Sequence, residues 1–192
     1  SLKRILIIAI VLCSSFVTKQ GEVQKKEFPW AKKTLMGMSL DEKIGQLFMV
    51  AAYSNKDASH TAAIENLITN YHIGGLIFFQ GTPRKQLELT NYFQDISKTP
   101  LMIGIDGEWG LNMRLKNTRK YPYQMTLGSL PNDSLIFKMG QQVGLECKAM
   151  GIHVNFAPVA DINNNPKNDC YSKSNITICN NLHITISTLG YL

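Results

Sequence analysis

The hydrophobic pattern of this chain centres on one short run, residues 101–105, which is followed at once by two carboxylates. The run is continuously apolar, too short for an amphipathic helix, and bounded by Pro100 and Gly107, as is typical of a buried strand. Strands covered on both faces are apolar throughout rather than alternating. Asp106 and Glu108 follow two residues apart, so they project to the same side if the extended backbone continues.

Three further runs predict buried strands at residues 48–52, 76–79 and 153–158. Helical spacing of apolar residues predicts helices over 58–71, 82–98 and 133–150. A shorter helix is expected from Ser39, because Ser39 and Glu42 match a capping box, and the pair Thr82–Pro83 is a second helix start. The apolar residues expected to be buried by the helix over 82–98 are Leu87, Leu89, Tyr92, Phe93 and Ile96.

Alternation of strands and helices with short connections indicates an α/β fold with a parallel sheet of βαβ units. A doubly wound open sheet and a (β/α) barrel both satisfy this pattern. No strand is followed by a G-x-G-x-x-G turn at a helix start, and polar residues recur at strand ends, which favours the barrel. These strand-end residues are Gln80, Asp106 with Glu108, and Asp161.

The carboxyl ends of parallel strands are where such folds place their chemistry, which makes Asp106 a candidate functional residue. The alternative is that Asp106 only caps the loop after its strand. The strand pattern alone leaves both interpretations open.

The net charge of +6 raises the question of a nucleic-acid partner. Seven of the basic residues lie within the first 33 positions, and no surface of interleaved basic and aromatic residues is evident. Much of the excess charge therefore belongs to a leader and a solvated linker, so we expect no nucleic-acid partner.

Residues 1–18 are expected to form a signal peptide or lipoprotein leader, with Lys3 and Arg4 ahead of an apolar run too short to span a bilayer. Cys13 fits either a lipid-attachment site or an ordinary cysteine of the apolar region, and the second is slightly favoured. Residues 19–35 are polar and predict a linker. Export permits disulfides, but the four cysteines show no framework spacing.

Four segments of the chain, taken together and in this order, resemble glycoside hydrolase family 3, and most of all its bacterial β-N-acetylhexosaminidases. The segments are Met38–Leu47, Gly74–Phe79, Ile105–Gly110 with Arg114, and Asn155–Asp161. The resemblance covers residues 36–168. It implies a TIM-like barrel that hydrolyses β-glycosidic bonds with retention, through a covalent glycosyl–enzyme intermediate.

The resemblance also implies roles for single residues. Asp106 would bind hydroxyls of the sugar at the cleavage point, with Glu108 beside it, Arg114 supporting their loop and Asp161 at the rim of the same pocket. Trp109 stands where the family commonly has glycine, and it could either stack on a sugar or fill the loop core. The implied partner is an amino-sugar glycan or cell-wall fragment; no cofactor and no metal are implied.

Carboxylate spacing alone would nominate Asp106 and Glu108 as nucleophile and acid, since retaining glycosidases place such groups about 5 Å apart. The resemblance points elsewhere: the family's nucleophilic aspartate lies on a later strand, and its acid/base histidine lies in a Lys-His-(aromatic)-Pro-Gly-His segment. This chain contains neither segment. We therefore expect no catalytic residue in this chain.

Residues 169–192 depart from the family pattern and are expected to be an unrelated tail from a frameshifted or truncated gene product. Cys170, Cys179 and His183 could bind zinc, but three ligands at uneven spacing are little evidence for such a site. Residues 36–168 would then form the amino-terminal half of a barrel, an inactive fragment of an exported enzyme located in the periplasm, at the outer membrane or outside the cell. A β-glucosidase and a non-catalytic carbohydrate-binding or pseudoenzyme fragment are the alternatives.

Overall fold

The computed structural model describes residues 28–159, which belong to two compact units divided between residues 37 and 38. The first unit contributes one helix, α2 (Pro29–Met36), which has proline in its first turn and no buried residue. The last part of the predicted linker is therefore helical. The leader, residues 1–18, lies outside the described residues. Within residues 28–159 no helix is long and apolar enough to cross a bilayer.

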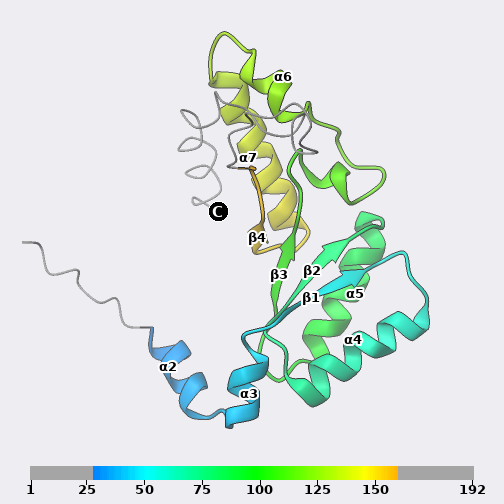
Figure 1. Ribbon diagram of the computed structural model, residues 1–192, viewed down its shortest axis with the longest axis vertical. Helices are drawn as coiled ribbons and strands as arrows, with labels where there is room; N and C mark the ends of the chain where they lie inside the picture. The colour runs from blue at the N-terminus through cyan, green and yellow to red at the C-terminus, as the bar shows by residue number, and fades with distance from the viewer. Residues whose placement is uncertain (1–27, 160–192) are drawn as a thin grey trace, which may run out of the picture. The chain divides into compact units, whose positions relative to one another are not determined.

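The second unit is a four-stranded parallel sheet in chain order (Figure 1). Its strands are β1 (Met49–Tyr53), β2 (Gly75–Phe79), β3 (Met102–Ile105) and β4 (Val154–Asn155). All three strand pairs are parallel, as the βαβ pattern predicts. The fourth strand is shorter than the predicted 153–158. Four strands are half the number that closes a TIM barrel.

Three long helices connect the strands: α4 (Ala58–Tyr71), α5 (Pro83–Ile96) and α7 (Ser134–Ala149). The side chain of Asp57 caps α4 by accepting from the backbone N–H of His60, and Thr82 caps α5 by accepting from that of Lys85. These caps explain why both helices start where the sequence predicts.

The buried face of α5 differs from the prediction. Gln86 and Thr90 are buried together with Phe93, whereas Leu87 and Tyr92 are 37% and 39% exposed. The apolar residues of this helix cover more than half of its circumference, so their spacing does not determine which arc faces the sheet. The tertiary packing selects an arc that includes two polar residues.

The two faces of the sheet differ in burial. On the outer face, four strand residues are fully buried and share one core cluster with residues of the three long helices. They are Leu76, Phe78, Ile103 and Ile105. On the inner face, Met102 remains 52% exposed, and Phe156, just past β4, remains 50% exposed. The core of the described structure therefore lies between the sheet and its helices.

Two short elements lie at the edges of this arrangement. Helix α3 (Leu40–Gly45) precedes β1 and begins with the predicted capping box, in which Glu42 N donates to Ser39 Oγ at 3.2 Å and Ser39 N donates to Glu42 Oε2 at 2.8 Å. The segment between β3 and α7 is not irregular throughout. It contains a 3-10 turn, η1 (Leu111–Met113), and a short helix, α6 (Gln124–Gly128).

Candidate functional site

The candidate site begins where β3 ends. Asp106 is the first residue beyond the strand, and its carboxylate forms an ion pair with Arg114 through Oδ2 and Nη2. Arg114 Nε also donates to the Asp106 carbonyl at 2.8 Å, so a single guanidinium binds both the side chain and the backbone of Asp106. The two side chains are 27% and 16% exposed, which leaves the carboxylate accessible but held in one orientation.

Arg114 is in turn positioned by the end of β2. Its guanidinium lies over the ring of Phe79, 4.6 Å from the centroid, and the Phe79 ring stacks on Tyr53 of β1 at 5.5 Å. The backbone of Gly81 donates to the Arg114 carbonyl at 3.1 Å. Residues at the carboxyl ends of β1 and β2 thus position Arg114, and Arg114 in turn orients Asp106 at the end of β3.

Glu108 lies in different surroundings from Asp106. Strand β3 ends at Ile105, before either carboxylate. Glu108 lines a cavity of about 40 Å³ together with Gln124, Asn155 and residues of α7. Gln124 Nε2 donates to the Glu108 carbonyl at 2.6 Å. The structure therefore places Asp106 beside Arg114, and Glu108 at this cavity.

Asn155 on β4 fastens the turn between the two carboxylates. Gly107 N donates to Asn155 Oδ1 at 2.9 Å, and Asn155 Nδ2 donates back to the Gly107 carbonyl at 3.3 Å. This reciprocal pair satisfies both polar groups of the Gly107 backbone and fixes the direction in which the chain leaves β3.

Gly110 closes the turn with a φ of +85°, a conformation that side-chain-bearing residues rarely adopt. A Cβ at this position would lie 2.6 Å from Cδ2 of Tyr121. The Tyr121 hydroxyl donates to Glu146 Oε1 on α7 at 3.0 Å. Burial, reinforced by this hydrogen bond to Glu146, raises the pKa of Tyr121 to about 12.

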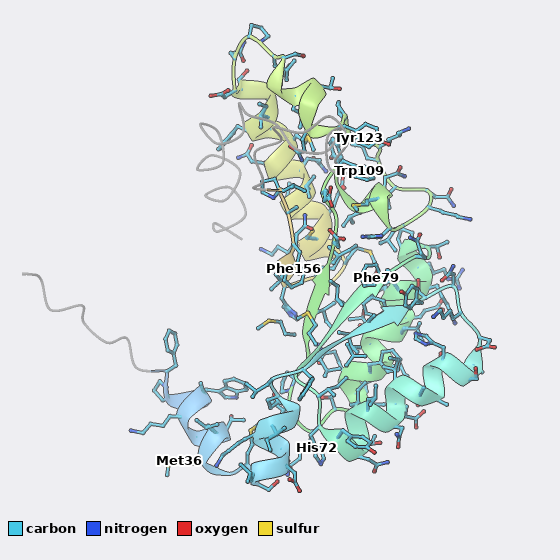
Figure 2. All side chains as sticks on the ribbon, in the orientation of Figure 1. Met36, His72, Phe79, Trp109, Tyr123 and Phe156 are labelled. Carbon is cyan, nitrogen blue, oxygen red and sulfur yellow. The ribbon has the colours of Figure 1, made fainter. Side chains whose placement is uncertain are left out.

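Trp109 and Tyr123 form an aromatic pair on the same loop. Their ring centroids are 4.8 Å apart and their planes are 85° apart, an edge-to-face geometry. Figure 2 shows the two rings beyond the carboxyl end of β3, on the side of the loop away from the long helices α4 and α5.

Sequence reasoning assigned roles to Asp106, Glu108, Arg114 and Asp161. Asp161, Cys13 and the three residues of the zinc alternative all lie outside the described residues. Within residues 28–159 no group of three or more histidine, cysteine or acidic residues could hold a metal ion.

Four residues of this site had no predicted role: Tyr121, Gln124, Glu146 and Asn155. Asn155 gave a usable signal, because a polar residue interrupts an otherwise apolar strand run. The other three lie 15 or more residues from Asp106 along the chain, and no local pattern connects them to it.

Two curated relatives show similarity over more than half of the chain. The chain is 27% identical over 139 residues to a β-N-acetylglucosaminidase/β-glucosidase of Cellulomonas fimi, a match that covers 72% of this chain and 24% of the relative. It is 34% identical over 118 residues to β-hexosaminidase A of Pseudoalteromonas piscicida. This match covers 55% of this chain and 20% of the relative. The chain thus corresponds to a fifth to a quarter of each relative.

Among solved structures, a β-glucoside phosphorylase is similar with a TM-score of 0.69 and 22% sequence identity, over 85% of this chain and 29% of that chain. At this identity the likeness concerns the fold. It agrees with the parallel sheet and outer helices of the second unit. The family model for the N terminal domain of glycosyl hydrolase family 3 matches residues 39–178, which include every element of that unit. The chain belongs to glycosyl hydrolase family 3.

Proposed function

We propose that this chain is the sugar-binding part of an exported glycosidase. The enzyme would remove terminal N-acetylhexosamine residues from β-linked amino-sugar glycans with retention of configuration. The observation that carries the proposal is the fixed carboxylate of Asp106 at the carboxyl end of β3, inside the region that matches the family. The names of the two curated relatives support an amino sugar. The leader-like residues 1–18 support export.

The geometry suggests how Asp106 would bind a sugar. Arg114 occupies Oδ2 and the backbone carbonyl, and among the described contacts Oδ1 has no partner. Oδ1 can therefore accept from a sugar hydroxyl, and hydrogen bonds to a carboxylate are stronger than those between neutral groups. Hydrogen bonds of this kind strengthen as the ring distorts toward the transition state.

We further propose that the 192-residue chain hydrolyses no glycoside by itself. A retaining mechanism needs a nucleophile and a proton donor about 5 Å apart across the scissile bond. Asp106 is engaged by Arg114, and Glu108 faces the small cavity beside Gln124 and Asn155. The described residues therefore supply binding without a matched catalytic pair.

Calorimetric titration of the purified chain with N-acetylglucosamine and with glucose tests the binding proposal. We expect N-acetylglucosamine to bind and Asp106→Ala to weaken it by at least about tenfold, the loss for a hydrogen bond to a charged group. The matched control is Asp95→Ala, which removes an exposed carboxylate on α5. Equal binding by wild type and Asp106→Ala would make Asp106 a loop cap. Preference for glucose would favour the β-glucosidase alternative.

An assay on aryl N-acetylglucosaminide and aryl glucoside tests the second proposal. We expect no turnover above background. Turnover that disappears in Glu108→Gln would show that this chain contains its own catalytic carboxylate. Sugar binding without turnover also fits the alternative of a non-catalytic binding fragment.

A further inference from the structure

Trp109 is only partly buried in the loop after β3. Leu111 and Leu115 are 2% and 0% exposed and belong to the core cluster, and Tyr121 packs against Gly110. Trp109 is not among the buried residues of the chain, and its ring partner Tyr123 is 45% exposed. The interior of the loop therefore contains these other side chains, and part of the Trp109 surface remains accessible to a ligand.

The aromatic pair is held by the same contacts that form the candidate site. Trp109 stands between Glu108, whose carbonyl accepts from Gln124 Nε2, and Gly110, which packs on Tyr121. Tyr123 directly precedes Gln124, so one hydrogen bond of 2.6 Å joins the two backbone segments that carry the rings. Two fixed rings lose little conformational freedom when a ligand binds, which favours recognition.

The pair is also close enough to Asp106 to contact the same ligand. Trp109 follows Asp106 by three residues, a separation of at most about 10 Å. Two linked sugar rings can span this distance. The C–H face of a pyranose is apolar and packs against aromatic rings, whereas its hydroxyl edge needs groups such as the Asp106 carboxylate.

We propose that Trp109 and Tyr123 form an aromatic subsite for the second sugar, the unit linked to the one that Asp106 binds. The ligand class is a β-linked oligosaccharide of at least two amino sugars rather than a single sugar. This inference rests on the proposed function, because it takes the sugar at Asp106 as its reference point.

The test is titration of the 192-residue chain with N-acetylglucosamine and with its β-1,4-linked disaccharide, followed by calorimetry and by tryptophan fluorescence. We expect the disaccharide to bind about five- to tenfold more tightly, the contribution of one aromatic contact. In Trp109→Ala we expect the ratio of the two dissociation constants to fall to about one. Tyr123→Phe, which keeps the ring, should preserve the ratio.

Trp30 provides the matched fluorescence control. It is the second tryptophan of the chain, it is 65% exposed, and it lies on α2 in the other unit. Trp30→Ala should keep the change in emission that the disaccharide causes, and Trp109→Ala should lose it. Circular dichroism and urea unfolding of each variant show whether it is folded, and Trp109→Leu, which keeps apolar volume without an aromatic ring, replaces Trp109→Ala if the latter unfolds.

The outcomes separate the two proposals. A wild-type ratio near one, or a ratio that Trp109→Ala leaves unchanged, overturns the aromatic subsite while sugar binding at Asp106 stands. Absence of binding by both sugars in the wild type overturns the proposed function and this inference together. Loss of all sugar binding in Asp106→Ala, with the disaccharide advantage confined to chains that retain Trp109, supports both.

Discussion

Both faces of the sheet carry apolar side chains, but their surroundings differ. Phe78 on the outer face is 0% exposed beneath the helices, whereas Phe156, which packs near Gly104 on the inner face, is 50% exposed. In Figure 1 the three long helices lie along one side of the sheet. An apolar side chain contributes to stability only as far as it leaves water, so the same residue type has two different energetic roles in this molecule.

The loop that carries the candidate site is attached to the buried side. The core cluster includes Leu111 and Leu115, and Tyr121 packs against it. Glu146 of α7 accepts a hydrogen bond from the Tyr121 hydroxyl. Asp106 and Trp109 then lie at the rim, anchored from beneath. The functional residues thus depend on the stable face of the sheet for their positions.

The strongest test of the comparison removes one phenylalanine from each face. Phe78→Ala should destabilise the chain by about 3–5 kcal/mol, because it empties a fully buried site. Phe156→Ala should cost only about 1 kcal/mol, because half of its surface is already in water. Urea unfolding followed by circular dichroism measures both. Equal losses would show that the inner face is covered by residues outside 28–159.

A second test concerns the attachment of the loop. Gly110→Ala should destabilise the chain by about 2–4 kcal/mol, because the new Cβ meets the Tyr121 ring at 2.6 Å in a strained backbone conformation. The matched control is Gly151→Ala, which also has positive φ but whose nearest atom would be 3.9 Å away. That variant should lose about 1 kcal/mol. If thermal or urea unfolding shows similar losses of stability in both variants, the Tyr121 ring moves aside at little cost.

The parts of the fold that follow from local chemistry were predictable. A capping box at Ser39 and a capping hydroxyl before Pro83 each specify a helix start, and the structure confirms both. Continuous apolar runs located all four strands, and βαβ connectivity then required parallel neighbours in chain order. These features depend on neighbouring residues, which the sequence displays directly.

The parts that were not predictable depend on packing between distant segments. Gln86 is fully buried while Leu87 is exposed, because the rotation of α5 is set by what the sheet presents to it. At the site, the family pattern indicated Asp106 and Arg114 as neighbours in one loop, but not that Phe79 supports Arg114 or that Asn155 fixes Gly107. Such contacts join residues 35 or more positions apart, and no periodicity encodes them.

The smallest expected change in stability concerns an ion pair that lies on neither face of the sheet. Glu42 on α3 pairs with Lys98, just beyond α5, and this hydrogen bond, together with the Ser39 backbone N–H, lowers the pKa of Glu42 to about 2. The folded chain therefore holds this carboxylate ionised more strongly than the unfolded chain, where its ordinary value is 4.5. The resulting stability is fully present above pH 4.5 and is lost as the pH falls from 4.5 through 2.

Lys98→Met removes the largest cause of that shift, so the pKa of Glu42 should rise toward its ordinary value and the acid-dependent loss of stability should become shallower. The control is Arg84→Met, which breaks the pair between Arg84 and Glu88 on α5. Their side chains are 91% and 49% exposed, and solvent screens such pairs. Urea midpoints measured between pH 7 and pH 2 should therefore fall less steeply for Lys98→Met than for wild type, with Arg84→Met close to wild type. Identical slopes in all three proteins would show that Lys98 does not stabilise the ionised form of Glu42.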